Sequence, residues 1–369
     1  MSPHALSMLL AFAAATPFVV AQIDPAVTKP LADKRFNYPD QVPYMVDTDQ
    51  GTRRGPQLGY NKCNSTTEGE NSMCQTGFLN SLDDFCLWAP SKPNSLIADT
   101  EGEEVAWCTK PGRGTRVIPP GALQGVQFMR TPDYIQVVGF IDNTKINLQA
   151  DDSGGELDPH GADLRGNPMG GLLYSNGFPS NNGNNQTFQQ VIEWHNFMGG
   201  NAFCFKACDP AGKNAADFCQ HIYDRIGCAY NAPNAAQKGV YESCQGDNQD
   251  FPGIYTENGQ VMTYTQPPES LGAIATMPYQ PRVPASSNCV TFSSEQLYAT
   301  AAATSSGAQA KATGASASSS SKAGSAKNAD ATSASSSSSS GAAGAPGVGG
   351  GFSALVALGG VIAGMLLIN

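Results

Sequence analysis

The sequence contains few charged residues, which limits the kinds of molecule that it can bind by electrostatic attraction. Charged residues make up 14% of the 369 positions, and 31 Asp and Glu outnumber 21 Lys and Arg. The densest basic runs are Arg53-Arg54 and Lys110 to Arg116, which are too short and too isolated to attract a phosphate backbone. The composition therefore argues against nucleic acid as a partner.

Motifs of nucleophilic, zinc-protease and phosphate chemistry are missing as well. The sequence contains no G-x-S-x-G, H-E-x-x-H or P-loop pattern. After the amino-terminal leader it has three histidines, His160, His195 and His221. They could converge on a metal, but residues so far apart in sequence are more often ordinary packing or surface residues. We predict no metal site and no cofactor.

The amino terminus has the pattern of an export signal. An apolar run from Leu9 to Val20 ends in small residues, and cleavage after Ala21 would remove residues 1–21. The dibasic pair Lys34-Arg35 resembles a processing site, which would make residues 22–35 a propeptide and Phe36 the mature start. The alternative is an uncleaved exposed loop.

The carboxyl terminus has the order of a glycosylphosphatidylinositol (GPI) signal. Small residues around Ser340 precede a flexible spacer and an apolar segment from Phe352 to Ile368, with no basic residue behind it. We expect residues 341–369 to be removed and Ser340 to carry the lipid that ties the protein to the membrane. A retained anchor helix is the alternative.

A low-complexity segment precedes this signal. Serine and threonine fill 18 of the 40 positions from 301 to 340, and no aromatic residue occurs there. Such a segment cannot bury enough apolar surface to offset the entropy of ordering it. We predict a disordered, O-glycosylated stalk over residues 296–340.

The ten cysteines mark the folded head, predicted over residues 36–295. An even number in an exported chain predicts five disulfides, whose pairing the sequence does not decide. A cysteine-free stretch of 95 residues separates two groups, which suggests two bridged flanks around an unbridged middle. Zinc bound by Cys204, Cys208 and His221 is a disfavoured alternative. The first group is Cys63, Cys74, Cys86 and Cys108, and the second is Cys204, Cys208, Cys219, Cys228, Cys244 and Cys289.

Residue patterns predict a mainly β head with one or two short helices. Segments 125–130 and 134–141 are rich in β-forming residues, and 145–149 is expected as a third neighbouring strand. Segments 190–197 and 202–208 read as further strands, and four-residue spacing over 214–227 predicts a helix that Gly227 ends. The similar stretches "DDFCLWAP" and "EEVAWCTK" are expected to pair, with their tryptophans in the core.

Two N-x-Ser/Thr sequons, at Asn64 and Asn185, lie in polar surroundings typical of surface loops. We predict N-glycosylation at both positions. The phrase "DNQDFPG", residues 247–253, fits either a ligand-binding loop or a turn.

The stretch with the most suggestive chemistry is "DDSGGELDPHGADLR", residues 151–165. Three interpretations compete: a calcium site, whose spacing does not match an EF-hand; a catalytic centre; and a structural loop in which Arg165 pairs with an aspartate. The catalytic candidates are Asp158, His160 and Asp163, and the ligand-binding candidates are Asp151, Asp152, Glu156 and Arg165.

Long strings carry a family resemblance. "TEGEEVAWCTKPGRGTR", "FMRTPDYIQVVGFID", "SGGELDPHGADLRGNPMGG" and "DRIGCAYNAP" are similar to basidiomycete macrophage-activating glycoproteins, over about residues 55–295. The resemblance implies a secreted or surface-attached fungal glycoprotein and supplies no catalytic residues.

These observations predict a GPI-anchored fungal glycoprotein at the cell surface or wall. We expect a noncatalytic recognition or adhesion module that contacts wall or host glycans through aromatics such as Tyr230, Tyr241 or Tyr264. A glycan-active hydrolase using acidic residues of 151–165 is the alternative.

Overall fold

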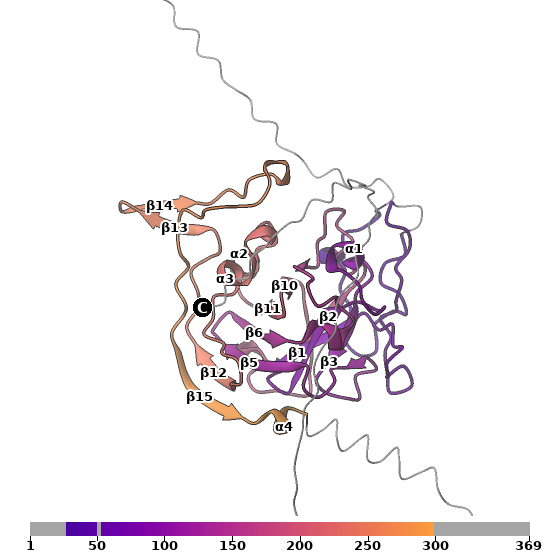
Figure 1. Cartoon of the computed structure of the whole chain (residues 1–369). Helices are drawn as coiled ribbons and strands as arrows, with labels where there is room; N and C mark the ends of the chain where they lie inside the picture. The colour runs from indigo at the N-terminus through magenta and orange to yellow at the C-terminus, as the bar shows by residue number, and fades with distance from the viewer. Residues whose placement is uncertain (1–26, 50–52, 299–369) are drawn as a thin grey trace, which may run out of the picture. The chain divides into compact units, whose positions relative to one another are not determined.

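The computed structural model describes residues 27–49 and 53–298, and the head in this range is mainly β (Figure 1). Within it there are four α-helices, more than the one or two predicted, and each has only four or five residues. They are α1 (Ile97–Thr100), α2 (Ala215–Phe218), α3 (Gly227–Asn231) and α4 (Ser294–Leu297), accompanied by the 3-10 helices η1 (Leu31–Asp33), η2 (Asn143–Ile146), η3 (Pro179–Asn181), η4 (Asp224–Ile226) and η5 (Glu269–Leu271).

One sheet has six strands and forms the amino-terminal side of the core. In spatial order its strands are β4 (Arg116–Val117), β3 (Val105–Cys108), β2 (Asp84–Ala89), β1 (Thr76–Ser81), β8 (Leu172–Ser175) and β9 (Gln189–Val191). The predicted pairing of the two tryptophan stretches is confirmed, because β2 and β3 are antiparallel neighbours and both Trp88 and Trp107 are buried.

The second sheet has seven strands. In spatial order they are β15 (Ser286–Phe292), β12 (Tyr241–Gly246), β5 (Leu123–Arg130), β6 (Tyr134–Ile141), β11 (Ala202–Cys208), β10 (Trp194–Gly199) and β7 (Gly155–Leu157). A hairpin of β13 (Ile254–Glu257) and β14 (Gln260–Thr263) lies apart from both sheets (Figure 1).

Aromatic side chains join the two sheets into one core. Trp88 of β2 lies 5.9 Å from Trp194 of β10, between ring centroids, and the Trp88 amide donates to Asn196 Oδ1 at 3.0 Å. Phe85 stacks on Phe203 of β11 at 6.1 Å. Fully burying aromatic side chains of this size is a large favourable contribution to folding.

Three of the predicted elements differ in the structure. Residues 145–149 form no strand, because the Asp142 carboxylate accepts the Thr144 amide at 3.1 Å and caps the helical turn η2. The strand predicted over 190–197 is interrupted at Ile192 and Glu193. The helix predicted over 214–227 stops at Phe218, and Gly227 begins α3 instead of ending a helix.

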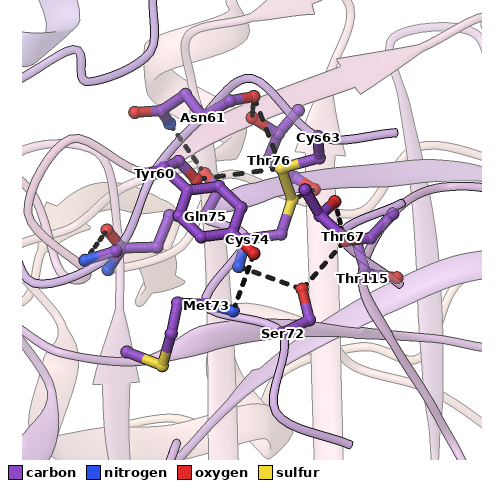
Figure 2. Close-up of a disulfide and its surroundings, with 12 residues drawn as sticks. Tyr60, Asn61, Cys63, Thr67, Ser72, Met73, Cys74, Gln75, Thr76 and Thr115 are labelled. Carbon is purple, nitrogen blue, oxygen red and sulfur yellow. Dashed lines mark hydrogen bonds between the residues drawn. A yellow bond between two sulfur atoms is a disulfide. The ribbon is translucent and has the colours of Figure 1, made fainter. Parts of the chain in front are cut away.

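Five disulfides staple the head, as predicted, and none crosses between the two cysteine groups. The pairs are Cys63–Cys74, Cys86–Cys108, Cys204–Cys228, Cys208–Cys219 and Cys244–Cys289. Figure 2 shows the Cys63–Cys74 bridge, where Thr76 Oγ1 donates to the Asn61 carbonyl and the Cys74 amide donates to Ser72 Oγ. Each disulfide therefore joins two cysteines of the same group, so no bridge connects the amino-terminal group to the carboxyl-terminal group.

The predicted leader, stalk and lipid signal lie outside the described residues, apart from residues 296–298. The predicted stalk start at 296 is too early, because Leu297 of α4 and Tyr298 are buried in the core of the head. The dibasic pair lies inside them: Lys34 Nζ donates to the Val46 carbonyl at 3.1 Å, Arg35 is exposed, and Leu31 is buried in the core. Cleavage after Arg35 stays a prediction. In the described ranges no helix has the length and apolar character of a membrane span.

Candidate functional sites: a histidine and glutamate cluster and an aromatic groove

Most polar side chains of the 151–165 segment hold the backbone in place. The Asp152 carboxylate accepts the amides of Ile97 at 3.1 Å and Gly154 at 3.0 Å. Asp163 receives a two-point ion pair from Arg54, whose Nε lies 2.8 Å from Oδ2. Asp151 is exposed to solvent.

Arg165 is buried and anchors this segment to the amino-terminal part of the head. Its Nε lies 2.7 Å from Asp47 Oδ2, and its Nη2 donates to the Gly55 carbonyl at 2.7 Å. The structural interpretation, in which Arg165 pairs with an aspartate, is therefore the one that the contacts favour. The partner aspartate comes from 118 positions earlier in the chain, so the spacing within the segment could not identify it.

Glu156 and Asp158 are buried carboxyl groups next to this anchor. Neither side-chain oxygen of Glu156 has a hydrogen-bond partner among the described residues, and burial raises its pKa well above the usual range. Burial also raises the pKa of Asp158, although its Oδ1 accepts the amides of His160 at 2.7 Å and Gly161 at 2.8 Å. The Asp158 carboxylate thereby fixes the turn that presents His160.

His160 and Glu193 lie just beyond the paired residues of β7 and β10. These strands pair antiparallel with Leu157 opposite Asn196, and the turn at Asp158 then carries His160 toward Glu193, the residue before β10. Their side chains meet, with His160 Nε2 at 3.3 Å from Glu193 Oε2. Both side chains are half-buried.

A disulfide brings His221 to the same place. The Cys208 amide, at the end of β11, donates to the Glu193 carbonyl at 2.9 Å, and Cys208 is bridged to Cys219. The chain two residues beyond Cys219 is thus held beside Glu193. There the His221 ring stacks on the His160 ring, with centroids 3.7 Å apart and planes 14° from parallel.

The three side chains form the histidine and glutamate cluster, defined as His160, Glu193 and His221. Their ligand atoms all lie within 4.8 Å of one another. Burial lowers the pKa of His221, and the charge of the adjacent His160 lowers it further. Two imidazole nitrogens beside a carboxylate oxygen are a donor set that can hold a transition-metal ion.

His195 does not join this cluster. It is fully buried within β10, where burial lowers its pKa well below the usual range and neither ring nitrogen has a hydrogen-bond partner among the described residues. The zinc alternative through Cys204 and Cys208 is wrong, because both sulfurs are bound in disulfides. The three histidines therefore separate into a buried core residue and a facing pair.

A second candidate site is a groove of about 770 Å³ beside the β13–β14 hairpin. Its wall holds Tyr255 and Tyr279, whose rings stack with centroids 4.9 Å apart and planes 3° from parallel. Tyr230 meets Tyr279 edge-on at 5.4 Å. Polar side chains share the lining, among them Gln249, Gln280 and Arg282.

The groove contains one of the three tyrosines named from the sequence. Tyr230 lines it, while Tyr241 and Tyr264 are buried, with Tyr241 Oη donating to the Leu123 carbonyl. Residues 249–252 supply part of the lining and residues 252–253 form a turn, so the ligand-loop interpretation of the segment 247–253 stays a prediction. Tyr255 and Tyr279 were missed, although each follows a proline-containing turn, a context in which aromatics often remain accessible.

Both sequons are accessible in the structure. Asn64 and Asn185 are exposed, and the Asn64 side chain accepts the Thr66 amide at 2.9 Å in a tight local turn. Asn185 belongs to the rim of a further polar cleft that also contains Arg113 and Arg130. Occupancy by glycans stays a prediction.

Comparison with known proteins places the chain among fungal proteins. It is 44% identical over 261 residues to "Appressorium protein ROW1" of Mycosarcoma maydis, covering 69% of this chain and 57% of ROW1. It is 41% identical over 222 residues to "Appressorium protein ROW2" of the same fungus, covering 59% of this chain and 72% of ROW2. The chain belongs to this ROW family.

Membership in the ROW family confirms the fungal character that the sequence resemblance implied. The macrophage-activating glycoprotein assignment is finer than these relatives support and stays a prediction. No protein-family profile and no solved structure matches the chain. With five disulfides, which require an oxidising compartment, family membership indicates an extracellular or cell-surface protein. The chain spans little more than half the length of ROW1.

Proposed function

We propose that this ROW family protein is a noncatalytic surface module that binds neutral wall polysaccharide in the aromatic groove. The observation that carries the proposal is the parallel Tyr255 and Tyr279 pair in an open groove. The relatives are named for the appressorium, a fungal cell structure bounded by a wall. A wall-binding surface protein fits that setting.

The groove has the chemistry that a sugar chain needs. Tyrosine rings offer flat apolar area to the C–H faces of sugar rings, and their hydroxyls and neighbouring amides can bond to sugar hydroxyls. Burial raises the pKa of Tyr279 to about 12, so its hydroxyl keeps its proton at physiological pH. Arg282 and Asp250 at the edge pair with each other at 3.2 Å, and Glu257 is the other charged side chain of the lining. The groove therefore has no excess of positive charge to select an acidic polymer.

The proposal includes attachment to the membrane. A GPI lipid on Ser340 and an O-glycosylated stalk that begins after Tyr298 would hold the head away from the bilayer and within reach of the wall. Phosphatidylinositol-specific phospholipase C should release the protein from wall-stripped cells. Retention after digestion, together with recovery of peptides from 341–369, would contradict this part.

The contacts of the 151–165 segment favour binding over hydrolysis. A glycosidase needs two carboxyl groups free to flank the bond that is cleaved. Asp152 and Asp163 are engaged by backbone amides and by Arg54, and Glu156 is buried. The alternative of a hydrolase at this segment therefore has weaker support than the groove.

Pull-down on insoluble β-glucan and chitin tests the groove. We expect the double variant Tyr255→Ala and Tyr279→Ala to bind at least about tenfold more weakly, because it loses the apolar platform. The matched control is Tyr44→Ala, which removes a 63% exposed ring stacked on Tyr60 outside the groove. Equal binding by the double variant and the wild type would overturn the proposal, as would failure of the wild type to bind either polymer.

A further inference from the structure

The histidine and glutamate cluster brings together three segments that are far apart in the sequence. His160 comes from the turn after β7, Glu193 from the link between β9 and β10, and His221 from the loop after α2. All three side chains are half-buried, so they are shielded but remain reachable from solvent.

The surroundings of the cluster favour a cation. Asp158 is buried and close enough to both His160 and His221 to interact with their charge. Glu101 and Asp224 act on the buried Glu156 in the same neighbourhood. Arg54, the nearby cation acting on Glu101, already forms its two-point ion pair with Asp163. Several carboxyl groups thus lie around the two imidazoles.

We propose that His160, Glu193 and His221 bind one divalent transition-metal ion, of which Zn²⁺ fits the donors best. Two imidazole nitrogens and one carboxylate oxygen suit zinc, whereas Ca²⁺ and Mg²⁺ prefer oxygen ligands alone. Zinc bonds are about 2.0–2.2 Å long and lie in the plane of each imidazole ring, so the stacked rings of His160 and His221 must rotate apart for both to bind one ion. Three protein ligands leave a coordination position for water or another oxygen donor.

The fold holds the segments that carry the ligands close together. The turn fixed by Asp158 carries His160, and the Cys208–Cys219 disulfide holds the segment that carries His221. A second grouping of Glu242, Cys244 and Cys289 offers no comparable site, because its two sulfurs are bonded to each other. The proposal is independent of polysaccharide binding.

Zinc titration of the full chain tests the site. The protein is made in a fungal secretory host without a histidine tag, stripped with chelator, and titrated with ZnCl2 alone in a calorimeter. We expect one zinc per chain. We also expect at least about a tenfold loss of affinity in His221→Gln and in Glu193→Gln, since each variant removes a ligand. The matched control is Glu257→Gln, an exposed carboxyl group on the β13–β14 hairpin.

Thermal unfolding and nuclear magnetic resonance give further readouts. Zinc should raise the Tm of the wild type and of Glu257→Gln but not of the ligand variants. In the wild type it should shift the imidazole signals of His160 and His221 and leave those of His195 unchanged. Because these signals are measured on the wild type, they test zinc binding at His160 and His221 even if a variant fails to fold. Absence of saturable zinc binding, unchanged affinity in folded His221→Gln, or zinc shifts confined to His195 would overturn the proposal.

Discussion

The two-sheet core and the carboxyl-terminal arm, residues 250–285, are built on different principles. In the core, Trp88, Phe85 and Phe203 belong to one continuous cluster of buried apolar side chains. In the arm, Val261 and Leu271 are 74% and 73% exposed, and every residue of β14 is exposed. Burial of apolar side chains therefore stabilises the core, whereas much of the apolar surface of the arm stays exposed.

Polar contacts to neighbouring loops hold the arm. Tyr230 Oη donates to the Tyr279 carbonyl at 3.2 Å, and Tyr279 Oη accepts the Gly253 amide at 2.9 Å. Tyr223 Oη donates to the Tyr264 carbonyl at 3.1 Å. Segments with many exposed backbone groups and few apolar contacts open more easily than a core. The comparison shows that the proposed ligand groove lies at the arm, the part of the head that is expected to open more easily than the core.

The largest predicted effect is in the core. Trp88→Ala removes a buried ring that lies between the two sheets, and we expect it to lower the free energy of unfolding by about 3–5 kcal/mol. Denaturant unfolding with the disulfides intact measures this. A loss below about 1 kcal/mol would show that the two sheets do not share a core.

The next effect concerns the disulfide at the base of the arm, which joins β12 and β15 of the seven-stranded sheet. Replacing Cys244 and Cys289 by Ser opens a bridge with a sequence separation of 45, and we expect a loss of about 2–4 kcal/mol. Limited proteolysis should then cut within the arm first, while the strands around Trp88 stay protected. Simultaneous cleavage in both regions would contradict the separation of arm from core.

A third change should stabilise the core. Glu104 is buried, burial raises its pKa well above the usual range, and its Oε2 lacks a partner among the described residues. Because the raised pKa favours the protonated form in the folded state, the group destabilises the fold as pH rises above its unfolded value, about 4.3. Glu104→Gln should therefore add about 1–3 kcal/mol at pH 7 and almost nothing at pH 4.

Thermal unfolding of Glu104→Gln at both pH values provides the check. The Thr100 hydroxyl, which lies 2.6 Å from Glu104 Oε1, can bond to the amide oxygen as well. A stabilisation of the same size at pH 4 and pH 7 would mean that ionisation of Glu104 is not the cause.

The smallest effect is expected on the arm surface. Val261→Asn changes a side chain that is 74% exposed, and we expect a shift within about 0.5 kcal/mol. Its unfolding curve should overlay that of the wild type. A loss as large as that of a core residue would show that the hairpin packs against an apolar surface.

Local patterns predicted the central strands well. Segments 125–130, 134–141 and 202–208 are apolar runs bounded by turn residues, and they form β5, β6 and β11. The predictions failed where a single side chain decided the backbone: Asp142 caps a helical turn in place of a strand, and the Cys208–Cys219 bridge lies where the predicted helix stops.

The candidate sites were less predictable because they depend on contacts between distant segments. His160 was identified from its polar surroundings, but its partner Glu193 lies 33 positions away and meets it only through the turn after β7. His221 is held in the cluster by the Cys208–Cys219 disulfide, and the sequence alone could not show which of the ten cysteines pair. Tyr255 and Tyr279 meet only after the arm folds back on itself.

Hydrogen exchange of the full protein with and without soluble β-glucan tests the central claim most directly. The account predicts rapid exchange in the arm of the free protein, slow exchange in β2, β6 and β11, and glucan-induced protection confined to the groove segments 249–257 and 278–282. Protection around His160 and Glu193 instead, or no change anywhere at saturating glucan, would contradict it.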